Sequence, residues 1–132
     1  MYNFNVFHIH IIININNELV NKINFTKTAE QTATVTTSTL TYTGLSVTIP
    51  ANKFYIVEAI GQYANCNITN MLIATSNTNT ANGRTNAQST TVGKGSRVQY
   101  IGFSSTSSVT YYLWAKGESA ASTSVIFYAV YC

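Results

Sequence analysis

Acidic residues are scarce in this sequence, and aspartate is absent. The carboxylate side chains are those of Glu18, Glu30, Glu58 and Glu118. Without aspartate the chain can form neither a Ser-His-Asp triad nor an Asp-rich calcium loop. Because Glu58 has no second carboxylate near it in the sequence, it offers no basis for glycoside hydrolysis. We therefore expect a protein that is not an enzyme.

Charge of either sign is also rare, at 8% of the 132 residues, which is about a third of the usual share. The seven lysines and arginines give a formal net charge of +3. They are scattered along the chain and form no basic stripe of the kind that binds phosphate backbones, so nucleic acid is not an expected partner. Weak self-repulsion also permits tight association between copies of the chain.

Cysteine is limited to Cys66 and Cys132, which allow one disulfide at most. A framework of disulfide-stapled loops would need more. The sequence therefore favours two buried or terminal thiols over a bridge.

The opening segment Phe7–Asn17 (FHIHIIININN) is apolar, but it does not resemble a membrane segment. It is far shorter than the roughly 20 apolar residues of a spanning helix, and no positive charge precedes it as in a secretory signal. We expect a protein that is not inserted into a membrane and that stays in the cytoplasm where it is made, unless it leaves as part of a particle. With period two, the segment predicts a β-strand, with Phe7, Ile9, Ile11, Ile13 and Ile15 on one face and His8, His10, Ile12, Asn14 and Asn16 on the other.

Seven further segments have strand character and are separated by turn-forming residues. No segment has a helical period long enough to predict a helix. The expected strands are Thr32–Thr39, Gly44–Ile49, Phe54–Tyr63, Ile68–Ser76, Arg97–Ser104, Val109–Lys116 and Ser124–Tyr131. About eight strands without helices predict an all-β sandwich or jelly roll.

The longest irregular piece, Asn77–Gly95, is rich in asparagine, threonine, serine and glycine. A loop of this length in a compact domain is usually functional or mobile. A solvated crossover between two sheets is the other interpretation, and both stay open at this point.

Four segments resemble the C-terminal head domains of bacteriophage tail fibres and related receptor-binding proteins. Two of them are Gly44–Asn52, which contains VTIPAN, and the following strand Lys53–Tyr63. The others are the aromatic strand Tyr111–Gly117 (YYLWAKG) and the closing strand Val125–Tyr131 (VIFYAVY). The resemblance covers about residues 26–131 and brings no catalytic motif with it.

Heads of this kind resemble the trimeric jelly rolls of the C1q and tumour-necrosis-factor type. The resemblance implies an all-β jelly-roll sandwich of about eight strands that assembles as a homotrimer. We expect an N-terminal strand or neck over residues 1–25 and the jelly-roll head over residues 26–132.

His8 and His10 lie two residues apart and therefore share one face of the expected strand. In a single chain, two imidazoles make a poor metal site, so half-exposed histidines are the simpler interpretation. In a parallel trimer the same pair would supply six nitrogens, enough for a transition metal such as iron or zinc. Fibrous phage tips that resemble this arrangement hold iron with His-x-His repeats. Purified protein without stoichiometric Fe, Zn or Ni would exclude the site.

Aromatic residues suggest where copies of the chain could meet. Tyrosine and tryptophan combine a large apolar area with one polar tip, which suits a subunit interface. Trp114 could also stack against a sugar ring, although an interior or interface position is more common for such a residue. The interface candidates are Tyr112, Trp114 and Tyr128.

Glu58 lies among apolar residues in the middle of an expected strand. A buried carboxylate there would need a partner such as Lys53, Arg97 or Lys116. The sequence favours the other interpretation, in which Glu58 faces solvent or a subunit seam.

Two hypotheses of different class follow. The first is a virion structural protein, a trimeric tail-fibre head that binds a host-surface glycan or protein without covalent chemistry. Several weak contacts would then add up to useful avidity. The second is a decoration or assembly protein of the virion with the same fold and no receptor, and in both cases other phage tail proteins are partners. The candidate receptor-binding residues, all from the long loop, are Asn77, Asn79, Asn82, Arg84 and Asn86.

Overall fold

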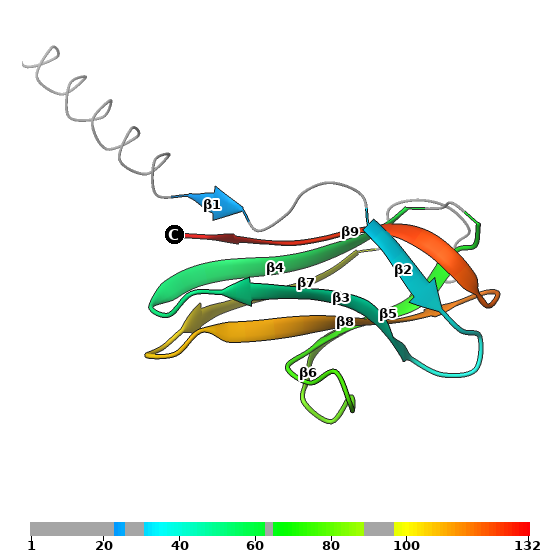
Figure 1. Ribbon diagram of the computed structural model, residues 1–132, viewed down its shortest axis with the longest axis horizontal. Coiled ribbons are helices and arrows are strands. Elements are labelled where there is room, and N and C mark those ends of the chain that lie inside the picture. The colour runs from blue at the N-terminus through cyan, green and yellow to red at the C-terminus, as the bar shows by residue number, and fades with distance from the viewer. Residues whose placement is uncertain (1–22, 26–30, 63–64, 89–96) are drawn as a thin grey trace, which may run out of the picture.

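The computed structural model describes residues 23–25, 31–62, 65–88 and 97–132. These residues fold as an all-β sandwich of two antiparallel sheets, and no helix occurs among them (Figure 1). The first sheet comprises β1 (Asn24–Phe25), β2 (Gln31–Val35), β4 (Lys53–Gln62), β7 (Arg97–Ser104) and β9 (Ala121–Tyr131). The second sheet comprises β3 (Thr41–Ile49), β5 (Ile68–Ala74), β6 (Gly83–Gln88) and β8 (Val109–Gly117). This part of the chain offers no helix long and apolar enough to cross a membrane.

The strands pair as a nested set around the hairpin of β5 and β6. Next, β4 pairs with β7, β3 with β8 and β2 with β9, so that each pair encloses the previous one in the sequence. The first sheet has the order β1-β9-β4-β7, with β2 also paired to β9, and the second has the order β3-β8-β5-β6. The last strand, β9, consequently lies inside the first sheet rather than at its edge.

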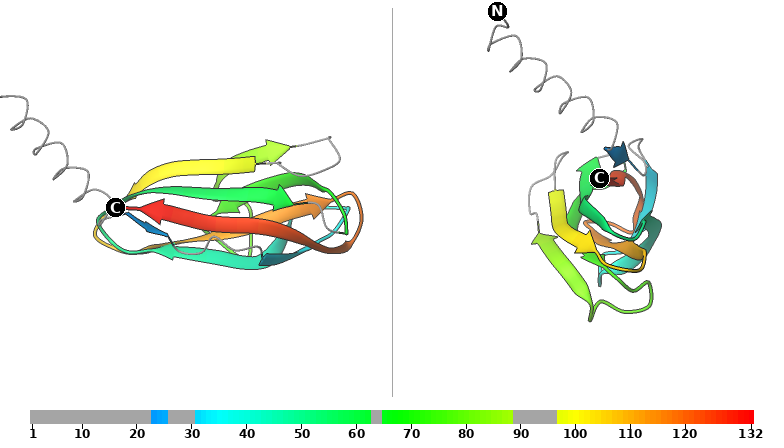
Figure 2. Two further views of the ribbon diagram at one scale, coloured as in Figure 1. Left: turned by 90° about the horizontal axis from the view of Figure 1, so that it is seen from above. Right: turned by 90° about the vertical axis from the view of Figure 1, so that its left-hand side faces the viewer.

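Alternation with period two places one side of each central strand in the core. In β4 the buried residues Tyr55, Val57 and Ala59 point inward, and in β9 Val125 and Phe127 do the same. Aliphatic side chains of β5 and β8 complete this main hydrophobic cluster from the second sheet. Figure 2 shows the two layers from above and from one end, with β6 and β7, the edge strands of the two sheets, side by side on one flank.

Hydrogen bonds fix one end of the sandwich, where the turn between β3 and β4 meets the end of β7. Asn52 has a φ of 59°, a left-handed conformation that asparagine tolerates better than most residues. Its N–H donates to the carbonyl oxygen of Ser105 at 2.8 Å. The Ser104 hydroxyl donates to the carbonyl oxygen of Pro50 at 2.6 Å and accepts from the Lys53 N–H at 2.9 Å. This end therefore holds β4 and β7 in a fixed register.

The structure confirms the seven strands that we expect between residues 32 and 131, with boundaries displaced by a few residues. The expectation that Asn77–Gly95 is irregular is wrong in part, because β6 occupies Gly83–Gln88 within it. The short strand β1 is a further addition. The strand expected over residues 7–15 lies outside the described residues, and the division into neck and head stays a prediction.

The two cysteines are free thiols, as the sequence predicts. Cys66 is buried and Cys132 is exposed. A Cβ added at Gly117 would lie 3.2 Å from the Cys66 sulfur, so the buried thiol fills space against the end of β8. Its role in the described structure is therefore packing.

Candidate functional site

The outer side of the first sheet carries an apolar face. All of the exposed large hydrophobic side chains among the described residues belong to it, and Phe54 and Ile101 are the most exposed, at 68% and 67%. Monomeric proteins rarely leave such side chains clustered on a sheet, and a cluster of this kind is typical of an interaction surface. We define the apolar face by Ile23, Phe54, Ile56, Ile101 and Phe103.

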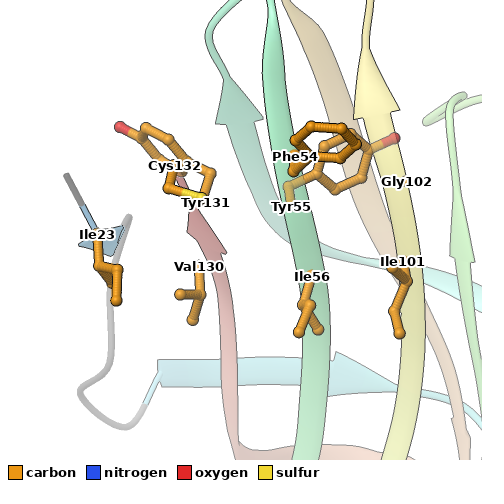
Figure 3. Close-up of a pocket in the computed structure, with 9 residues that line it drawn as sticks. All are labelled: Ile23, Phe54, Tyr55, Ile56, Ile101, Gly102, Val130, Tyr131 and Cys132. Carbon is orange, nitrogen blue, oxygen red and sulfur yellow. The ribbon is translucent and has the colours of Figure 1, made fainter. Parts of the chain in front are cut away.

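Strand register brings these side chains together. Phe54 lies opposite Phe103, with ring centroids 4.7 Å apart, and Ile56 lies opposite Ile101. Figure 3 shows Ile23, Val130, Ile56 and Ile101 in one row across the sheet. A shallow groove of about 270 Å³ runs among them, and its walls are almost entirely apolar.

The same alternation that builds the core produces this face. Residues 55, 57 and 59 of β4 point inward, so residues 54, 56 and 58 point outward. An antiparallel sheet that packs on the core with one side and faces water with the other normally carries polar side chains on the side that faces water. Here the outward positions near the start of β4 are Phe54 and Ile56, so this side of the sheet presents apolar side chains to solvent in the single chain.

A polar cluster centred on Glu58 borders the apolar face. Glu58 is only 6% exposed and lies between Gln99 on β7 and Tyr128 on β9. The Tyr128 hydroxyl donates to Glu58 Oε1 at 2.9 Å, and Gln99 Nε2 donates to Oε2 at 3.0 Å. Arg97 Nε lies 3.8 Å from Oε2. The carboxylate is thus fully partnered, as a buried charge must be.

Glu58 lies on the outer side of the sheet, but its burial contradicts the expectation that it is open to solvent, and a position at a subunit seam stays a prediction. Arg97 is one of the partners that a buried carboxylate would need. Burial, and then the hydrogen bond to Glu58, raise the pKa of the Tyr128 hydroxyl above its ordinary value. The phenol therefore stays protonated and continues to donate to the carboxylate.

Three tyrosines gather beneath the flank formed by β6 and β7. The ring centroids of Tyr55, Tyr100 and Tyr111 lie 5.6 to 6.3 Å apart, and the hydroxyls of Tyr55 and Tyr111 share a hydrogen bond. Gly102 leaves the space for this arrangement, because a Cβ there would lie 2.6 Å from the Tyr55 hydroxyl oxygen. Burial, followed by the hydrogen bond with Tyr55, raises the pKa of Tyr111 well above its ordinary value of 10.0.

We expect alkaline pH to destabilise the fold through Tyr111. Since its pKa is raised in the folded state, the stabilisation is complete below the ordinary value of 10.0 and is lost as pH rises above that value. There the unfolded chain binds fewer protons than the folded chain, so the free energy of unfolding falls by up to about 1.4 kcal/mol per pH unit for one such group. Urea denaturation at a series of pH values above this point should show a shallower fall for Tyr111→Phe than for the wild type. Equal slopes in the two proteins would contradict the assignment.

The residues that we predict to bind a receptor lie in two different elements of the structure. Asn77, Asn79 and Asn82 lie in the connection between β5 and β6, where Asn79 Oδ1 accepts a hydrogen bond from the Ala81 N–H at 3.1 Å. Arg84 and Asn86 lie in β6 instead of the loop in which we expect them, because the loop is partly a strand. The Arg84 guanidinium lies over the ring of Tyr100, 5.9 Å from its centroid. A receptor-binding role for these five residues stays a prediction.

The interface candidates lie on opposite sides of the sandwich. Tyr112 and Trp114 are on the outer side of the second sheet, clustered with Tyr42, whereas Tyr128 is on the outer side of the first. Trp114 is only 8% exposed, and its Nε1–H donates to the carbonyl oxygen of Ser76 at 2.9 Å. Its ring is therefore not available to stack against a sugar in this structure, and Tyr128 is the candidate next to the apolar face.

His8 and His10 lie outside the described residues, so their metal site stays a prediction. Within the part of the chain that the structure describes, no group of three or more His, Cys, Asp or Glu residues could hold a metal ion.

No protein-family model matches the chain, and no curated protein matches it.

Sequence reasoning missed two features of this region. The apolar face was not recognised because both sides of β4 are apolar in sequence, with Phe54 and Ile56 on one side and Tyr55 and Val57 on the other. The tyrosine cluster joins residues from three strands that are separated in the sequence. The only signal that could have found it is the high tyrosine content, which gives no positions.

Proposed function

We propose that this protein is the homotrimeric jelly-roll head of a phage tail fibre and that it binds a glycan on the host cell surface. Binding is non-covalent, and the protein acts as a virion structural component. The apolar face carries the proposal, since it gives the chain a surface that copies of itself would cover.

The nested strand pairing supports a jelly roll of the C1q and tumour-necrosis-factor type. A jelly roll is a double-sheet fold of eight strands, and β2 to β9 pair in four nested pairs over two sheets. All connections from β2 to β9 cross between the sheets except the one between β5 and β6. This arrangement agrees with the resemblance of the four sequence segments.

The composition of the apolar face supports association of like chains. Its aromatic and aliphatic side chains are the kind that form the centre of homo-oligomer interfaces, where charged residues are depleted. Glu58 and Arg97, which border the apolar face, already pair with each other within one chain. A second copy can therefore approach without leaving an unpaired charge. The proposal of three copies in the assembly is based on the resemblance to trimeric heads.

Two measurements test the proposal. Light scattering on the purified full chain should give three times the mass of 14.4 kDa. Fluorescently labelled protein should adhere to some members of a panel of bacterial cells, and adhesion should fall after enzymatic removal of surface glycans. A trimer that adheres to no cell would favour the decoration or assembly protein, and a monomer at micromolar concentration would contradict the proposal.

A further inference from the structure

A second hollow lies at the β6–β7 flank and shares Tyr55 with the lining of the apolar groove. It has a volume of about 290 Å³, at the lower end of the range for ligand pockets and suited to one sugar ring. It lies where the two sheets meet, with β6 and β7 as its rim. Its lining includes Tyr55, Arg84, Tyr100, Tyr111, Ser107 and Ser108.

The pocket holds a positive charge, that of Arg84, which has no acidic partner among the described residues. Among the described residues the one ion pair is that of Arg97 with Glu58, so no described carboxylate neutralises Arg84. The guanidinium lies over the Tyr100 ring, which favours this position at the rim. A guanidinium held in this way presents N–H donors in a fork that matches a carboxylate.

The pocket also offers neutral hydroxyl groups. Tyr55 and Tyr111 carry two hydroxyl protons, and their mutual hydrogen bond uses one, which leaves a donor for another acceptor. Like any tyrosine, Tyr111 keeps its hydroxyl proton at neutral pH, and its raised pKa extends this into the alkaline range. Ser107 and Ser108 are exposed on the connection between β7 and β8 and add two hydroxyls that can donate or accept. A ligand with several hydroxyls and one negative charge matches this set.

We propose that this pocket binds one acidic sugar residue, with the sugar carboxylate on Arg84 and the sugar hydroxyls on the tyrosine and serine hydroxyls. The inference rests on the proposed glycan binding and deepens it by naming the class of sugar. A neutral sugar would leave Arg84 without its anion. A phosphate, which carries more charge, is normally held by several cationic or N–H donors, whereas the described lining has one cationic side chain.

The proposal is tested by calorimetric titration of the full chain with a pair of sugars that differ in one group and with one further acidic sugar. Methyl glucuronide has a carboxylate where methyl glucoside has a hydroxymethyl group, and N-acetylneuraminic acid is the second acidic probe. At least one acidic sugar should bind at least about tenfold more tightly than methyl glucoside, because a charge-assisted hydrogen bond is lost with the neutral sugar. Arg84→Gln should remove this preference. Arg84 is exposed, so the variant should fold normally.

Lys116→Gln is the matched control, because it removes the same charge at the other end of β8 from Tyr111. It should keep the wild-type affinity. The proposal fails if neither acidic sugar binds better than methyl glucoside, if Arg84→Gln binds as the wild type does, or if inorganic phosphate binds as tightly as the acidic sugars.

Cell adhesion separates this failure from failure of the proposed function. If wild type and Arg84→Gln adhere equally to the same bacterial cells, the pocket assignment is wrong while the fibre-head function stands. If the wild type neither forms trimers nor adheres, the fibre-head function fails as well.

Discussion

Ile101→Glu is expected to convert the proposed trimer into folded monomers. Ile101 is 67% exposed in the single chain, so a glutamate there can remain in water and the sandwich should keep its stability. In an assembly that covers the apolar face, the same carboxylate would be buried without a partner, which costs several kcal/mol. We expect the dissociation constant to rise at least about 100-fold. Light scattering over a dilution series measures this change.

Ser46→Glu provides the control for the added charge. Ser46 is exposed on β3, in the second sheet, and its outer side is remote from the apolar face. This variant should have the mass of the wild type at every concentration. If Ile101→Glu also keeps the wild-type mass, the apolar face is not where the copies meet.

Phe127→Ala is expected to lower the free energy of unfolding by about 3 to 5 kcal/mol. Phe127 has no exposed surface and lies in the main hydrophobic cluster, where its loss leaves a cavity that the close-packed sheets cannot fill. A domain of this size is stable by only about 5 to 15 kcal/mol. The variant should therefore be close to unfolding, and urea denaturation measures the loss.

The same substitution at an exposed phenylalanine is the control. Phe54 is 68% exposed, so Phe54→Ala should lower the unfolding free energy of the monomer by no more than about 1.5 kcal/mol, through the loss of its ring pair with Phe103. Both changes are best made in the Ile101→Glu protein, which we expect to be monomeric. Dissociation of subunits then does not contribute to the measured free energy of unfolding. Phe127→Leu, which should cost less than about 1.5 kcal/mol, keeps the comparison possible if Phe127→Ala does not fold. Equal losses at the two phenylalanines would contradict the described core.

The sequence was sufficient to predict the all-β class and most strands, because alternation with period two survives in segments such as β4 and β9. It failed for β6, whose sequence GRTNAQ has no alternation and few residues that favour strands. This strand forms because β5 offers a free row of backbone donors and acceptors, and backbone pairing does not depend on side-chain type. β6 is therefore a strand because it pairs with β5, and not because of its own sequence.

The candidate site was harder to predict from the sequence than the fold. Sequence reasoning selected Arg84 as part of a polar loop, but its structural partner, Tyr100, lies on another sheet. Alternation also could not decide which apolar side of β4 faces the core, since that choice depends on the sheet that packs against it. Glu58 shows the same limit: its partners Gln99 and Tyr128 are neighbours only after β7 and β9 have paired with β4.

The interior position of β9 has a consequence for how the protein is made. Of the described strands β9 is translated last, yet it must enter between β4 and the two strands β1 and β2. A nascent chain therefore cannot complete the first sheet until Tyr131 has left the ribosome, and before that one side of β4 remains an open edge. Such edges pair readily with other chains. Any association of copies through this sheet would thus have to begin after β9 has been made, and chaperones that hold incomplete chains would raise the yield.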